Sequence, residues 1–272
     1  MKDIKIKRHS AERSSFVKRG ALEEDYDTVI AENCRLIDAE SGEVLGVYYH
    51  YFPHDDLDPL RAVLRRIKYQ TDERTSGLKT TSRIFGYMPR IPMRADFCRS
   101  TSLAKEAPNE HRAVCSLAVP ISAAYNAALP ERFATHLAEV RGKVKSEYII
   151  GETPFTSGII NKNNPLKYHF DTGNFRDVYS AMVVLKKGYS GGRLCWPEYR
   201  IALETGDGSL TLFDGQSILH GVTPFTKTSA DAYRYSIVYY SLLGMWKCLE
   251  PSAEIQRIRE VKTLRERKRA GI

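Results

Sequence analysis

The second half of the chain consists of short runs of β-forming residues separated by turn residues, and this pattern limits the possible folds more than any other feature. Glycines in the segments GYSGG, TGDG and DG lie between these runs and supply the conformations that hairpin turns need. Many short strands at nearly even spacing predict an antiparallel sandwich or jelly roll rather than a parallel α/β sheet. The runs cover residues 146–151, 178–185, 193–196, 199–203, 209–213, 217–220 and 233–243.

Helical patterns flank these runs. Residues 44–52 (VLGVYYHYF) favour a strand, whereas residues 58–70 predict an amphipathic helix, because an Asp-Pro pair precedes apolar residues at helical spacing. Residues 122–147 predict a second helical region that is interrupted at Pro130, and residues 252–272 predict a basic helix. The expected fold class is therefore α+β, with a jelly-roll core and flanking helices.

Composition limits the compartment and the partners. The chain has 41 Lys and Arg residues against 33 Asp and Glu, and this formal net charge of +8 favours polyanionic partners without proving one. No run of eighteen apolar residues occurs, and the N-terminus is charged where a signal peptide needs an apolar stretch. We therefore expect an intracellular protein (cytoplasmic, nuclear or in a virus-infected cell) that is not secreted, with no membrane or protein partner indicated.

The cysteines give no sign of a structural framework. They are odd in number, widely scattered and form no CxxC pair, so the sequence predicts buried thiols and neither a disulfide framework nor a zinc site. The five are Cys34, Cys98, Cys115, Cys195 and Cys248.

A histidine and an aspartate stand two positions apart in the segment YHFDTGNF, as His169 and Asp171. Residues two apart in a strand point to the same face, so these side chains can converge on one ion. His220 closes the segment GQSILH, where intervening hairpins can return it to the same end of a jelly roll. Two histidines and one carboxylate, with other positions open, suit non-haem Fe(II). The alternative for each histidine alone is a buried, hydrogen-bonded side chain.

Arg234 and Ser236 follow in the apolar segment YRYSIVYYS, on one face of the predicted strand. A guanidinium offers a planar fork for a carboxylate, and the hydroxyl adds a donor. The pair is suited to the far carboxylate of 2-oxoglutarate. A structural salt bridge is the alternative, because an unpaired buried charge is costly.

This ordered set, HxD, a distal histidine and RxS, resembles the pattern of Fe(II)/2-oxoglutarate-dependent dioxygenases, over roughly residues 155–243. The resemblance implies a double-stranded β-helix of jelly-roll type, with Fe(II), 2-oxoglutarate and O2 as cofactor and co-substrates. It assigns iron to His169, Asp171 and His220, and 2-oxoglutarate to Arg234 and Ser236. The segments GGRLCWPE and GSLTLFDGQSILHGVTP strengthen the likeness.

Within this superfamily the chain is similar to the TET/JBP group, which oxidises the 5-methyl group of cytosine or thymine in nucleic acid. HFDTGN resembles the group's HxDxxN, and HGVTPF followed by YRYSIVYYS resembles its HxxTP and RxSLVFY stretch. The resemblance implies that Asn174 contacts the flipped base and Tyr240 stacks on it; a turn asparagine and a core aromatic are the alternatives. TSRIFGYMPR (81–90) looks like an upstream segment of viral and transposon-borne relatives.

Two departures from the animal enzymes leave the substrate open. Leu242 stands where those enzymes have a base-contacting histidine, and their Cys-rich zinc region is absent, as in compact viral or microbial forms. The resemblance implies oxidation of 5-methylcytosine in DNA to 5-hydroxymethylcytosine, with further oxidation open. Thymine in DNA, a protein side chain or a small metabolite are alternative substrates, and a non-catalytic jelly-roll binding module is a third class.

We expect a single dioxygenase domain over residues 1–272. Residues 1–146 would form a helical and strand scaffold, 147–246 the jelly-roll catalytic core and 247–272 a basic C-terminal helix, which is either a solvated surface or a contact for the DNA backbone. The cluster HYFPHDD (50–56) is interpreted as a surface turn and helix start rather than a second metal site.

Overall fold

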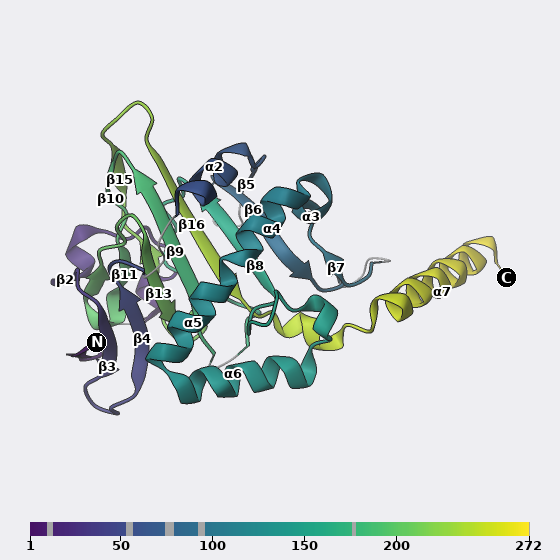
Figure 1. Cartoon of the computed structure of the whole chain (residues 1–272), viewed down its shortest axis with the longest axis horizontal. Helices are drawn as coiled ribbons and strands as arrows, with labels where there is room; N and C mark the ends of the chain where they lie inside the picture. Colours follow the sequence, from purple (N-terminus) through teal and green to yellow (C-terminus); the bar gives the residue numbers. More distant parts are fainter. Residues whose placement is uncertain (10–12, 53–56, 74–78, 92–95, 176–177, 272) are drawn as a thin grey trace.

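Two sheets and a layer of helices make up the computed structural model of the chain, which describes residues 1–9, 13–52, 57–73, 79–91, 96–175 and 178–271 (Figure 1). The larger sheet has ten strands. In spatial order these are β1 (Lys2–Ile6), β3 (Cys34–Asp38), β4 (Val44–Tyr49), β13 (Ser209–Phe213), β9 (Ser180–Lys187), β16 (Tyr233–Tyr240), β8 (Ser157–Lys162), β6 (Lys79–Met88) and β5 (Gln70–Glu73), with β7 (Arg99–Ser100) paired to β6.

The smaller sheet has four strands and packs against the larger one. Its order is β14 (Gly221–Val222), β11 (Leu194–Trp196), β12 (Ile201–Leu203) and β2 (Thr28–Ile30), and β10 (Tyr189–Gly191) forms a separate ribbon with β15 (Phe225–Lys227). Met182 and Phe213 of the larger sheet share a buried cluster with Leu194 and Trp196 of the smaller. Two sheets that enclose such a core form the jelly roll that the strand pattern predicts, so the α+β fold class is confirmed.

Helices cover the other face of the larger sheet, and Figure 1 shows α5 lying across it. The α-helices are α1 (Arg13–Phe16), α2 (Asp58–Arg66), α3 (Ser102–Glu106), α4 (Pro108–Ser116), α5 (Ala118–Ala128), α6 (Pro130–Lys143) and α7 (Pro251–Ala270). The 3-10 turns are η1 (Glu23–Asp25), η2 (Ser146–Tyr148), η3 (Pro197–Tyr199) and η4 (Leu243–Lys247). As predicted, the helical region around Pro130 is divided there, because proline cannot continue the hydrogen bonding of α5. Among the described helices, none is long and apolar enough to cross a membrane.

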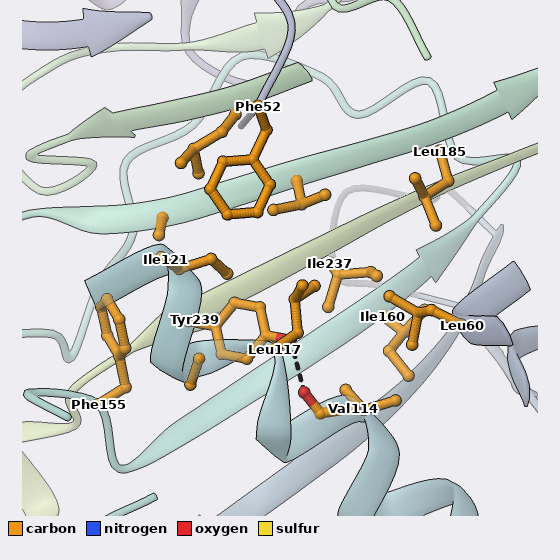
Figure 2. Packing of buried hydrophobic residues seen from close by; sticks show 14 of the residues in the cluster. Phe52, Leu60, Val114, Leu117, Ile121, Phe155, Ile160, Leu185, Ile237 and Tyr239 are labelled. Atoms are coloured by element: carbon orange, nitrogen blue, oxygen red, sulfur yellow. Dashed lines mark hydrogen bonds between the residues drawn. The ribbon is translucent and has the colours of Figure 1, made fainter. Parts of the chain in front are cut away.

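Strand β16 separates two environments by its alternation. Its odd-numbered residues, such as Ile237 and Tyr239, join the core under the helices, where the Tyr239 hydroxyl donates to the Val114 carbonyl at 2.7 Å (Figure 2). Successive side chains in a strand point to opposite faces. The even-numbered residues, from Arg234 to Tyr240, therefore point between the two sheets.

Two of the predicted strands are wrong. Residues 146–151 begin with the 3-10 turn η2, and Tyr148 is buried in a cluster beside α6. Residues 217–220 form no strand: the run begins in a turn, in which the Asp214 carboxylate accepts hydrogen bonds from the Gln216 amide and the Ser217 hydroxyl, and ends at the isolated bridge of His220. Apolar residues buried by tertiary contacts have the same composition as a short strand, so the sequence pattern does not separate them.

The prediction that all five cysteines are thiols is also wrong. Cys98 and Cys248 form a disulfide, whereas Cys34, Cys115 and Cys195 are free. The two bonded residues lie 150 positions apart, and their Cα atoms are 5.7 Å apart only because the fold places the start of α7 beside the segment that precedes β7. Cysteine spacing in the sequence carries no trace of this contact.

Candidate functional site

A cavity of about 270 Å³ lies between the two sheets. Apolar side chains from both sheets form much of its wall, among them Met182, Leu194 and Val238. The predicted site residues His169, Asp171, Asn174, His220, Ser236 and Tyr240 also line it. The structure therefore brings together residues that are scattered over more than seventy positions of the sequence.

The backbone holds the three predicted metal ligands in place. His169 and His220 form an antiparallel bridge, in which each amide donates to the other's carbonyl, at 2.9 and 3.2 Å. The Asp171 amide donates to the Gly215 carbonyl at 2.8 Å, which ties the HxD segment to the turn before His220. One potential ligand atom from each of the three side chains lies within 4.8 Å of the other two.

Hydrogen bonds orient both imidazoles. Nδ1 of His169 lies 2.8 Å from the Lys167 carbonyl, and Nδ1 of His220 lies 2.9 Å from the Ile218 carbonyl. A carbonyl only accepts, so each Nδ1 carries a proton, and Nε2 is the nitrogen that a neutral ring of this tautomer offers to a metal. The two Nε2 atoms lie 3.6 and 3.8 Å from Oδ1 of Asp171. Burial lowers the pKa of His220 to about 4, so this ring is neutral at neutral pH, the form that binds metals.

This donor set fits Fe(II). Two neutral imidazoles and one carboxylate on one side of an ion leave other positions for exchangeable ligands, as non-haem iron oxygenases require. Hydrogen bonds from each Nδ1 to a backbone carbonyl are the usual outer contacts of metal-binding histidines. Within the described residues, this is the one group of three or more His, Cys, Asp or Glu side chains that could hold an ion.

Arg234 extends the same face of β16 beyond the cavity wall and is 1% exposed. Its Nη2 donates to the Gly192 carbonyl at 3.1 Å and lies 3.4 Å from the Thr205 hydroxyl, whereas its Nε has no partner among the described residues. Burial lowers the pKa of Arg234 to about 10, so the side chain stays charged at neutral pH. No carboxylate pairs with it in the described chain, which argues against a structural salt bridge and suits a carboxylate ligand.

The predicted base contacts, Asn174 and Tyr240, also line the cavity. Asn174 is buried, and its Nδ2 donates to the Ser180 hydroxyl at 3.1 Å. Its backbone bridges that of Leu242, and both side chains line the cavity together with Tyr240. The site thus has an apolar wall, with the amide of Asn174 and the partly exposed ring of Tyr240 beside the candidate metal ligands.

Two glycines contribute to the site but cannot be recognised from the sequence. A Cβ atom on Gly215 would lie 2.2 Å from Oδ2 of Asp171, and one on Gly192, which has a φ of +78°, would lie 3.0 Å from Nε of Arg234. The sequence marks both only as turn residues. Both also leave room for candidate site side chains that come from other segments.

A buried carboxylate next to the His220 backbone also cannot be recognised from the sequence. Glu198 accepts hydrogen bonds from Arg8 at 2.7 Å, from Arg13, and from the Leu219 amide at 3.4 Å. It therefore links the N-terminal segment to the backbone next to a candidate ligand. In the cluster HYFPHDD, His50 contacts the Tyr48 hydroxyl through Nδ1 at 3.0 Å, and residues 53–56 lie outside the described part of the chain.

Comparison with known proteins gives one family and several relatives. Residues 90–242 match the Tet_JBP family, described as the oxygenase domain of the 2OGFeDO superfamily. The chain is 31% identical over 179 residues to thymine dioxygenase JBP1 of Trypanosoma brucei brucei, covering 64% of this chain and 21% of JBP1. It is 33% identical over 112 residues to the bifunctional helicase and thymine dioxygenase JBP2 of the same organism, covering 40% of this chain and 10% of JBP2.

The fold is similar to that of NgTET1, solved in complex with 5mC DNA. The TM-score is 0.61 with 13% identity, over 88% of each chain. The chain spans about a fifth of JBP1 and a tenth of JBP2, so these relatives hold much that this chain does not match.

Proposed function

The chain belongs to the Tet_JBP family of 2-oxoglutarate- and Fe(II)-dependent oxygenases, and from this premise we propose that it oxidises the 5-methyl group of 5-methylcytosine in DNA. Enzymes of this superfamily use Fe(II), 2-oxoglutarate and O2. The observation that carries the proposal is the placing of Asn174 and Tyr240 in the same cavity as the His-Asp-His group. Thymine in DNA is the second candidate, because JBP1 is named a thymine dioxygenase and shares 31% identity.

In this proposal His169, Asp171 and His220 hold Fe(II), and Arg234 with Ser236 holds the far carboxylate of 2-oxoglutarate. When bound there, Fe(II) would allow O2 to oxidise a C–H bond of the substrate to an alcohol while 2-oxoglutarate is converted to succinate and CO2. The task of the protein is to place a methyl group and to exclude water. The apolar side chains that line the cavity, such as Met182 and Phe213, suit this task because they offer no competing polar contact.

The substrate base must leave the duplex to reach a cavity between two sheets. Extrusion costs a few kcal/mol, which stacking and hydrogen bonds to the base must offset. Tyr240 offers a ring for stacking, and the amide of Asn174 can both donate and accept. Cytosine presents an amino group where thymine presents a carbonyl, so an amide can serve either base. Leu242 adds no polar contact that would choose between them.

The substrate assignment predicts which oligonucleotides gain oxygen. Otherwise identical duplexes would carry 5-methylcytosine, thymine or unmodified cytosine at one position, and nucleosides would be measured by mass spectrometry after incubation with iron, 2-oxoglutarate and ascorbate. We expect oxidation of 5-methylcytosine, and Asn174→Ala should reduce it by roughly tenfold while metal binding is unchanged. Oxidation of thymine alone would favour the second candidate, and succinate formation without any oxidised base would contradict both.

Gly215 provides a test of the metal site that does not need a substrate. In Gly215→Ala the new methyl group would collide with the Asp171 carboxylate, because the Cβ position lies 2.2 Å from Oδ2. We expect Mn(II), a redox-stable stand-in for Fe(II), to bind roughly 10- to 100-fold more weakly in titration calorimetry, as when outer contacts of a metal site are lost. Gly142→Ala is the matched control, since nothing lies within 4 Å of its Cβ position in α6. Equal Mn(II) affinity in all three proteins would remove Asp171 from the metal site.

A further inference from the structure

Helix α7 is fixed to the body by its first turns. The carboxylate of Glu254 is buried and accepts hydrogen bonds from Nε of Arg90 at 2.9 Å, the Leu249 amide at 2.9 Å and the Cys98 amide at 3.1 Å. Ile258 is also buried, and the disulfide to Cys98 lies just before the helix. These contacts set the direction in which the rest of α7 leaves the protein.

Beyond this anchor the helix is solvent-exposed. All residues from Lys262 to Ala270 are exposed, and Figure 1 shows this part of α7 extending away from the rest of the molecule. An isolated helix of this length is marginal in water, so the anchored turns support it. The exposed part packs on nothing within the described chain, so its side chains are available to a partner.

Most basic residues of the exposed part lie on one side of the helix, and Arg267 is the exception. At about 100° per residue, four basic residues fall within an arc of about 120°, and Glu260 and Glu266 fall outside it. None of these four forms an ion pair with any described residue, and like charges three or four positions apart repel one another. A polyanion would relieve this repulsion. The four, which we call the basic stripe, are Lys262, Arg265, Lys268 and Arg269.

The apolar residues of α7 do not favour a protein partner. Ile255 and Leu264 are its exposed large apolar side chains among the described residues, and nine positions place them on opposite sides of the helix. A coiled-coil seam needs apolar residues on one side at a spacing of three and four. The exposed part therefore offers a partner a charged surface rather than an apolar one.

The base of α7 also adjoins the candidate site. A second cavity, of about 590 Å³, is lined by Gly173, Leu243, Lys247 and Arg257. The Gly173 carbonyl accepts a hydrogen bond from the Leu243 amide at 2.9 Å, and its neighbours Thr172 and Asn174 line the first cavity. Residues 172–174 therefore connect the lining of the candidate site to a cavity at the base of α7.

We propose that the basic stripe of α7 binds the phosphate backbone of the DNA duplex whose base enters the site. This inference rests on the proposed function, because it takes DNA as the substrate. The basic stripe would neutralise phosphates without reading sequence, so it would raise affinity for any duplex long enough to reach α7. It would also hold the duplex beside the site while one base is extruded.

The test compares DNA binding by two double variants. One loses two positive charges from the basic stripe, and the other loses two positive charges outside it. In Arg265→Gln/Arg269→Gln, the slope of log affinity against log salt should fall by about two for a duplex of about 24 base pairs, since each phosphate contact contributes about 0.9. Affinity at about 0.1 M salt should fall by roughly tenfold or more. The matched control, Arg259→Gln/Arg267→Gln, loses the same charge from the other sides of the helix and should keep the wild-type slope.

The outcomes separate this inference from the function. If wild-type protein oxidises DNA and both double variants keep its salt slope, α7 does not bind the duplex although the function stands. Equal losses in both double variants would mean a general charge effect and would also overturn the basic stripe. If wild-type protein neither binds nor oxidises DNA, the proposed function fails and this inference fails with it.

Discussion

Asp171→Ala is expected to lower turnover at least about a thousandfold, which corresponds to about 4 kcal/mol of transition-state stabilisation. The substitution removes the one carboxylate among three candidate ligands and leaves two imidazoles whose Nε2 atoms lie 3.6 and 3.8 Å from the lost Oδ1. Two neutral ligands hold a divalent cation poorly. Succinate formation and oxidised bases would both be measured.

A second readout keeps this prediction separate from misfolding. Mn(II) should raise the unfolding temperature of the wild-type protein, because a ligand that binds the folded state stabilises it, and should have no such effect on Asp171→Ala. Asp231→Ala is the matched control, since it removes an exposed carboxylate that pairs with Lys187, and neither residue lines the cavity. Iron-dependent turnover at the wild-type rate in Asp171→Ala would refute the ligand assignment.

Arg234→Lys is expected to raise the 2-oxoglutarate concentration needed for half-maximal activity by roughly 10- to 100-fold, with Mn(II) affinity unchanged. Lysine keeps the charge but loses the planar fork that binds a carboxylate with two parallel hydrogen bonds. The effect should be large because Arg234 is 1% exposed and its Nε has no partner among the described residues. The measurement is a 2-oxoglutarate titration at saturating iron.

Arg61→Lys is the matched control for this experiment. Arg61 also uses its guanidinium as a fork, with Nη1 and Nη2 at 2.7 and 2.9 Å from the two oxygens of Asp207, but it lies outside the site cavity. Arg61→Lys should therefore leave the 2-oxoglutarate concentration needed for half-maximal activity unchanged. If Arg234→Lys lowered the unfolding temperature and left that concentration at its wild-type value, a structural role for Arg234 would be the better account.

Local sequence patterns are enough to predict much of the candidate site. Alternation along residues 233–240 places Arg234 and Ser236 on one face. His169 and Asp171 also converge, but the strand expected there is not formed, since only an isolated bridge at His169 lies in this segment. The position of His220 can be expected because hairpins return the chain to one end of a jelly roll. These features depend on spacing within a segment or on the order of segments, both of which a sequence displays.

Other features depend on which distant segments touch, and spacing does not display this. Gly215 matters because Asp171 comes within 2.2 Å of the place where its Cβ would be, and Cys98 meets Cys248 across 150 positions. Glu198 stands in an ordinary turn and gains its role from Arg8 and Leu219. In each case the residue type is common and the partner is remote, so only the folded arrangement identifies it.

The two faces of β16 have different surroundings, and this restricts how the protein can change over evolutionary time. Its two faces can accept substitutions under separate rules, one set by packing under the helices and the other by the chemistry between the sheets. A change in length follows neither rule. Inserting or deleting one residue within the strand would exchange the side chains of its two faces. Arg234 would then point into the hydrophobic core, or Ile237 and Tyr239 would point into the cavity. Descendants of this chain should therefore vary in residue identity along β16 and keep its length constant.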